Sequence, residues 1–144
     1  MIGRYGTYFL LPLIFIFFTG CDLFGSAEKS SRIEIRSEKN QYQVDQEADF
    51  SVTNESDESL FVQFCGPYLI SGIQRYDESW KSHDGTICPA IYEIGFESVA
   101  EPGETFRFSN SISEQGKYRG KLTYRIGLEG ENQTGYSSTF TVKE

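Results

Sequence analysis

The side chain best suited to acid–base catalysis is His83, the only histidine in the chain. It lies in a polar run, residues 77–86, together with Ser79, Ser82 and Asp84. A nucleophilic mechanism needs a base within hydrogen-bond reach of the nucleophile and a third group that orients the base. The run lacks the glycine-flanked turn that would hold such a serine in place. We therefore expect a solvated loop and no catalytic residue, with a small hydrolase as a remote alternative.

Two acidic clusters could be considered as metal sites. One contains Asp77, Glu78, His83 and Asp84, and the other lies within residues 54–58. Neither has the ligand spacing of a known cation loop, and neither places a glycine where a tight loop around a cation needs one. We interpret both as acidic turns and expect no metal and no other cofactor.

Cys21 follows a segment with the features of an export signal. Arg4 supplies a positive charge, and residues 8–18 form an apolar run interrupted only by Pro12. This run is well short of the roughly 20 residues that a membrane-spanning helix needs, but it suits the apolar part of a cleaved signal. We predict a signal peptide over residues 1–20.

Phe18, Thr19, Gly20 and Cys21 resemble the lipobox of bacterial lipoproteins, in which small residues precede an obligatory cysteine. The resemblance implies cleavage after Gly20, transfer of a diacylglyceryl group to the Cys21 sulfur, and acylation of the new amino terminus. Several acyl chains anchor a protein stably to a bilayer. Residues 21–31 would then be a tether with a reach of about 17 Å, in the cell envelope. The alternative is an ordinary signal peptide with a chance cysteine.

Cys65 and Cys88 remain as a pair if Cys21 carries lipid. Outside the cytoplasm a disulfide is the expected state of such a pair, and closing a loop of about 24 residues stabilises a fold by about 3 kcal/mol. The alternative, two free thiols in a metal or redox site, lacks both a CxxC spacing and further ligands. We predict the disulfide.

The chain is acidic, with a net charge of −8 at pH 7. This balance argues against a nucleic-acid partner and against adhesion to anionic lipid beyond the anchor. Four cations nevertheless share one face of a predicted strand: Lys117, Arg119, Lys121 and Arg125. Either they pair with carboxylates on adjacent strands, or they dock an anionic partner such as a glycan or an acidic protein patch.

Apolar and polar residues alternate with period two throughout the remaining chain, which is typical of half-buried strands. The clearest case is residues 117–126, where Tyr118, Leu122, Tyr124 and Ile126 lie on one face. Short strands are predicted within residues 33–36, 42–44, 48–53, 60–65, 68–76, 91–99, 105–108, 117–126 and 136–142. We predict an all-β fold, a single antiparallel β-sandwich over residues 32–144.

Three segments are similar to the immunoglobulin-like sandwiches of bacterial envelope proteins: residues 51–57, 99–104 and 114–120. The third resembles the start of strand F, which would make Tyr118 a tyrosine corner whose hydroxyl bonds to upstream backbone. Gly120 stands where immunoglobulins carry an inter-sheet cysteine. The first two segments are also similar to the BsuPI proteinase-inhibitor domain.

Three aromatic residues between Cys65 and Cys88 are candidates for a binding surface: Tyr68, Tyr76 and Trp80. On a segment held by a disulfide they suit a protein or glycan interface, and the other interpretation is a second core beneath the segment. We expect a non-catalytic, lipid-anchored binding module of the cell envelope, with a proteinase inhibitor as the alternative.

Overall fold

The computed structural model describes residues 32–144, so the predicted signal peptide, Cys21 and the tether lie outside the described residues. The described chain contains twelve strands: β1 (Ile33–Ser37), β2 (Gln41–Gln43), β3 (Glu47–Asn54), β4 (Leu60–Cys65), β5 (Tyr68–Leu69), β6 (Ser71–Asp77), β7 (Ser79–Gly85), β8 (Ile94–Ala100), β9 (Thr105–Ser111), β10 (Gly116–Ile126), β11 (Gln133–Tyr136) and β12 (Phe140–Lys143). Within this part of the chain, no helix is long and apolar enough to cross a membrane.

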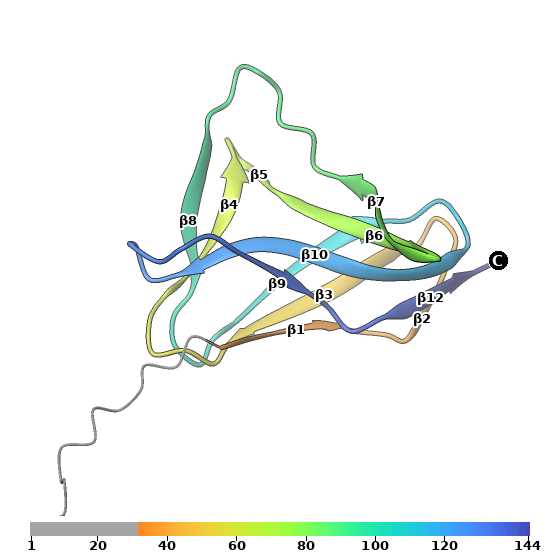
Figure 1. The fold of residues 1–144 in the computed structure, drawn as a ribbon, viewed down its shortest axis with the longest axis horizontal. Coiled ribbons are helices and arrows are strands. Elements are labelled where there is room, and N and C mark those ends of the chain that lie inside the picture. The colour runs from red at the N-terminus through yellow and green to blue at the C-terminus, as the bar shows by residue number, and fades with distance from the viewer. Residues whose placement is uncertain (1–31) are drawn as a thin grey trace, which may run out of the picture.

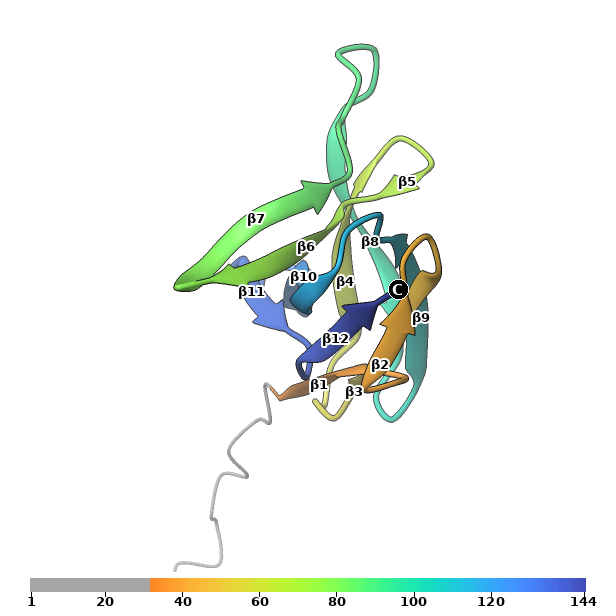
Figure 2. The same ribbon diagram turned by 90° about the vertical axis from the view of Figure 1, so that its right-hand side faces the viewer.

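The strands form two sheets packed against each other (Figures 1 and 2). The smaller sheet has the order β1-β3-β9, and the other nine strands make up the larger sheet. Among the strand pairs of residues 32–144, only β2 and β12 run parallel. The predicted all-β, antiparallel, two-layer fold is therefore confirmed.

Strand β10 is the centre of the larger sheet. It pairs with β6 and β4 along one edge and with β12 and β11 along the other. Because side chains alternate between the two faces of a strand, β10 contributes to both the core and the surface. Its buried residues are Tyr118, Gly120, Leu122 and Tyr124.

The core beneath β10 depends on a residue without a side chain. A Cβ atom on Gly120 would lie 2.7 Å from Cε1 of Phe50, which comes from the smaller sheet and is fully buried. Gly120 therefore lets the two sheets approach at this point. Next to it, the Tyr118 hydroxyl donates a hydrogen bond of 2.9 Å to the Glu114 carbonyl, the contact expected of a tyrosine corner.

Two parts of the larger sheet differ from the sequence prediction. Residues 77–86, expected to be a loop, contain β7, which pairs with β6 from Gly72 to Asp77. Residues 136–142, expected to be one strand, belong to β11 and β12, which pair with different parts of β10. Between them, Ser137 Oγ accepts a hydrogen bond of 2.8 Å from the Gly120 amide, so a side chain replaces a ladder bond.

We predict that Gly120→Ala lowers the free energy of unfolding by about 1–3 kcal/mol, because the added methyl group overpacks the core against Phe50. Gly95→Ala in β8 is the matched control, since a Cβ atom there meets nothing within 4 Å. Urea unfolding of the two variants measures the difference. Equal stabilities would contradict the close approach of the sheets at Gly120.

Candidate functional site

Three of the four outward cations of β10 lie against aromatic rings from neighbouring strands. The guanidinium carbon of Arg119 is 4.3 Å from the ring centroid of Trp80 on β7 and 3.8 Å from that of Tyr136 on β11. Its Nε donates a hydrogen bond of 2.8 Å to Gln74 Oε1 on β6. One arginine is thus held by groups from three other strands, which fixes the direction of its charged end.

A second arginine has a similar environment further along β10. The guanidinium carbon of Arg125 is 5.4 Å from the ring centroid of Phe61 on β4 and 4.5 Å from that of Phe96 on β8. Near the start of β10, Lys117 Nζ lies 5.6 Å from the ring centroid of Tyr76. We call the outward residues of this region the cation–aromatic face: Lys117, Arg119, Lys121, Arg125, Phe61, Tyr76, Trp80, Phe96 and Tyr136.

The four cations of this face were predicted either to pair with carboxylates or to dock an anion. Within residues 32–144, none of them forms an ion pair with a carboxylate. The prediction of carboxylate pairing is therefore wrong: for three of the four cations, the neighbouring strands provide an aromatic ring in contact with the cation. Cation–π contact stabilises a cation without cancelling its charge, so the face stays positive on an acidic protein.

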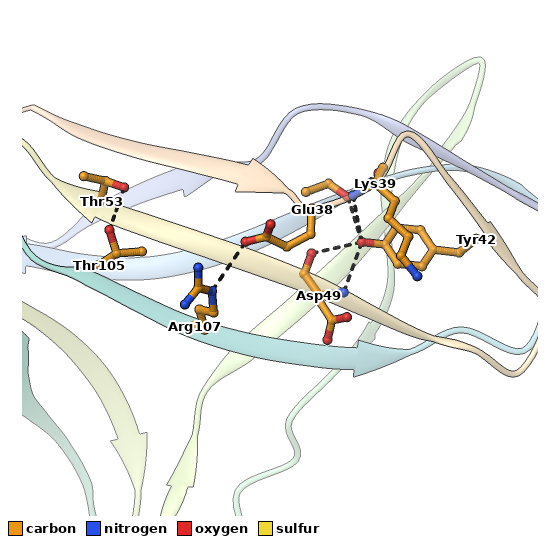
Figure 3. A network of polar contacts seen from close by, with 8 residues as sticks. Glu38, Lys39, Tyr42, Asp49, Thr53, Thr105 and Arg107 are labelled. Atoms are coloured by element: carbon orange, nitrogen blue, oxygen red, sulfur yellow. Dashed lines mark hydrogen bonds and ion pairs between the residues drawn. The ribbon is translucent and has the colours of Figure 1, made fainter.

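The outer face of the smaller sheet shows the opposite arrangement (Figure 3). Arg107 Nε there lies 3.6 Å from Glu38 Oε1, and the hydroxyls of Thr53 and Thr105 are 3.1 Å apart. At the edge of this sheet, the hydroxyl of the buried Tyr42, on β2 of the larger sheet, bonds to backbone groups of Lys39 and Asp49. Arg107 on this sheet thus lies beside a carboxylate, whereas Arg119 and Arg125 on the larger sheet lie against rings.

The arginines of the cation–aromatic face retain hydrogen-bond donors. Among contacts between described residues, the terminal nitrogens of Arg119 and Arg125 make no hydrogen bond, and the buried Nε of Arg125 has no partner. A guanidinium group presents up to five donors in a plane that matches a carboxylate or phosphate group. The face can therefore bind oxyanions without first breaking internal ion pairs.

The three aromatic residues predicted as binding anchors fall into two places. Tyr76 and Trp80 belong to the cation–aromatic face, with ring centroids 5.3 Å apart. Tyr68 instead lies with its ring centroid 6.0 Å from that of Tyr92. The sequence prediction did not include Phe96 and Tyr136, which complete the environments of the two arginines.

The predicted Cys65–Cys88 disulfide is present, with the two Cα atoms 5.6 Å apart. It ties β4 to the loop between β7 and β8, which projects from the sheets at the end remote from the start of β1 (Figures 1 and 2). Ile87 and Ile91 in this loop are 87% and 83% exposed. The loop is therefore a second exposed feature, apolar rather than charged.

His83 lies on β7, with its ring centroid 5.3 Å from that of Tyr118. It makes no hydrogen bond with any described residue, so no nucleophile is held against it. A neighbouring pocket of about 480 Å³ is lined by Arg75, Tyr76, Asp77, Lys81, Ser82 and His83. Its charges are paired, Arg75 with Glu114 and Lys81 with Asp77.

Two groups near this pocket have shifted pKa values. A hydrogen bond from Lys81, assisted by the charge of the same ammonium group, lowers the pKa of the Asp77 carboxyl. Burial raises the pKa of the Tyr118 hydroxyl. Both groups therefore keep their ordinary charge at neutral pH, the carboxylate negative and the phenol neutral. Within residues 32–144, no group of three or more histidine, cysteine or acidic residues is placed to hold a metal ion.

The sequence matches no protein-family model and shows no significant similarity to any curated protein.

We predict that Arg119→Gln lowers the free energy of unfolding by about 1 kcal/mol, because two ring contacts are lost. The emission of Trp80, the only tryptophan, should move to longer wavelength as water reaches the indole. Arg36→Gln is the control, since Arg36 forms only an exposed ion pair with Glu34, and it should change stability by less than about 0.5 kcal/mol. Unchanged emission in Arg119→Gln would contradict the stacked geometry.

Proposed function

We propose that the protein is a lipid-anchored, non-catalytic binding module of the cell envelope, and that the cation–aromatic face is its binding surface for an anionic ligand. One observation carries the proposal. In an acidic protein, three of the four cations on this face of β10 lie against rings, and none of the four forms an ion pair with a carboxylate of residues 32–144. Such a face attracts negative charge by ordinary electrostatic complementarity.

The fixed geometry of the arginines supports the same proposal. Arg119 is held by two rings and by Gln74, and Arg125 by two rings. A free arginine loses side-chain entropy when it binds a ligand, and a side chain that is already ordered loses less. The aromatic edges around the cations add apolar contact area, a common feature of binding hot spots.

The anchor is the second part of the proposal, and it rests on the lipobox resemblance. We expect the membrane-extracted protein to have the mass of a chain that begins at Cys21 and carries acyl groups. Two thiols should appear only after reduction, because Cys65 and Cys88 are joined. Intact mass spectrometry with and without reduction and alkylation measures both. A chain without acyl mass would contradict the proposed anchor but would not bear on the proposed binding surface.

The binding surface is tested with polymers of defined charge. We expect the detergent-extracted mature protein to bind at least one polyanion among polygalacturonate and polyglutamate, and not the neutral polymer dextran. Binding is followed by Trp80 emission and should weaken as salt is added, since salt screens exposed charges. The double variant Arg119→Gln/Arg125→Gln should bind about tenfold more weakly or worse, a change of about 1.4 kcal/mol.

The matched control is Arg36→Gln/Arg107→Gln, which removes the same net charge from arginines that lie beside Glu34 and Glu38. It should bind like the unmodified protein. Equal weakening in both double variants, or no binding of either polyanion, would contradict the proposal. A different result would favour the alternative of a proteinase inhibitor that acts through the exposed loop. In that case the protein would inhibit a proteinase, Ile87→Asp would abolish the inhibition, and neither polyanion would bind.

A further inference from the structure

A shallow groove of about 180 Å³ lies within the cation–aromatic face, between β6, β7 and β10. Gly72 on β6 stands beside Gly85 on β7, so two adjacent positions of the sheet carry no side chain. The residues that line the groove are Ile70, Ser71, Gly72, Ser82, Asp84, Gly85, Thr86, Lys121 and Thr123. The groove is smaller than the pockets that hold drug-sized ligands, and it suits a single sugar ring.

Lys121 supplies the positive charge of the groove. Unlike Lys117, Arg119 and Arg125, it has neither a ring contact nor an ion pair among the described residues. It follows Arg119 by two residues and precedes Arg125 by four, which corresponds to about 7 and 14 Å along the strand. Three cations in a row favour a ligand that presents negative charges repeatedly along its length.

Hydroxyl groups make up much of the remaining lining. The hydroxyls of Ser82 and Thr123 form no hydrogen bond with any described residue. The Thr86 hydroxyl donates a hydrogen bond of 2.8 Å to the Leu69 carbonyl and has a lone pair that can still accept one. Asp84 also lines the groove, but its cross-strand partner is the core residue Ile73, so the register directs its side chain to the other face of the sheet. The hydroxyls of Ser82 and Thr123 can therefore exchange hydrogen bonds with sugar hydroxyls.

The aromatic ring of Tyr136, which contacts Arg119, lies on the strand across Lys121 from the groove. Tyr136 on β11 is the cross-strand partner of Lys121, and its side chain is 42% exposed. Flat apolar surface next to a hydroxyl-lined groove complements a sugar ring, which has C–H groups on its faces and hydroxyls at its edge. Charge, hydrogen bonding and ring contact thus point to the same class of ligand.

We propose that this groove binds a carboxylated sugar unit of an acidic polysaccharide, with Lys121 on the carboxylate and Ser82 and Thr123 on the hydroxyls. This inference rests on the proposed function, because it assigns a ligand class to the same face. An acidic protein patch would use Arg119 and Arg125 equally well, but it would have no use for the hydroxyl-lined groove.

The test compares three polymers on the detergent-extracted mature protein: polygalacturonate, its methyl-esterified form and polyglutamate. Polygalacturonate should bind most tightly. Its methyl-esterified form should bind much more weakly, because esterification removes the negative charge. Polyglutamate should bind more weakly than polygalacturonate at equal charge concentration. Lys121→Gln should weaken polygalacturonate binding about tenfold. Lys143→Gln, on β12, removes the same charge outside the groove and should have little effect.

The hydroxyl contacts are tested with Ser82→Ala/Thr123→Val, which keeps the charge of the groove. This variant should weaken binding of polygalacturonate and leave polyglutamate unaffected, and its far-ultraviolet circular dichroism should match that of the unmodified protein. Equal binding of polyglutamate and polygalacturonate, insensitive to this variant, would overturn the sugar assignment while the proposed function stands. Failure of both polyanions to bind would overturn the inference and the proposed function together.

Discussion

The pairing of β10 with four other strands is the constraint on which the rest of this structure depends. Because its side chains alternate, one face of β10 must fill the core and the other must meet solvent. The core face carries Tyr118, Gly120 and Leu122, all buried. The same pairing brings β6 and β7 to one edge and β11 to the other, so rings from distant parts of the sequence converge on the cations between them.

The two faces of β10 are coupled through this geometry. Gly120 sets how closely the smaller sheet approaches, because any side chain there would strike Phe50. Its backbone is also bonded to Ser137, which follows Tyr136 directly. The position of Tyr136 over Arg119 therefore depends on the same backbone that packs the core. A face built on a central strand is more rigid than one carried by a loop, and it presents its charges at fixed spacing.

The sequence was sufficient to predict those features that depend on local alternation or on a pair of residues. The strands around Tyr118 and Phe50, the two-layer fold and the Cys65–Cys88 disulfide belong to this group. It was not sufficient for β7, whose residues are mostly exposed and show no period of two. That strand is ordered by its backbone pairing with β6, and the polar composition of the segment does not reveal a partner.

The candidate site was predicted only in part for a related reason. The sequence showed that four cations share a face, but not which groups from other strands lie opposite them. Contacts such as Arg125 with Phe96 depend on register between strands, and a shift by one residue would reverse every side chain. Tyr68 and Trp80 lie in one disulfide-bounded segment, yet they contact different neighbours because β6 separates them.

The most direct measurement is lysine acetylation of the detergent-extracted mature protein, read by mass spectrometry with and without polygalacturonate. If the outer face of β10 binds the polymer, Lys117 and Lys121 become protected from the reagent. Lys39 and Lys143, which lie outside this face, should react as before. Protection of Lys39 and Lys143 without that of Lys117 and Lys121, or equal reactivity of all four with and without polymer, would contradict the account.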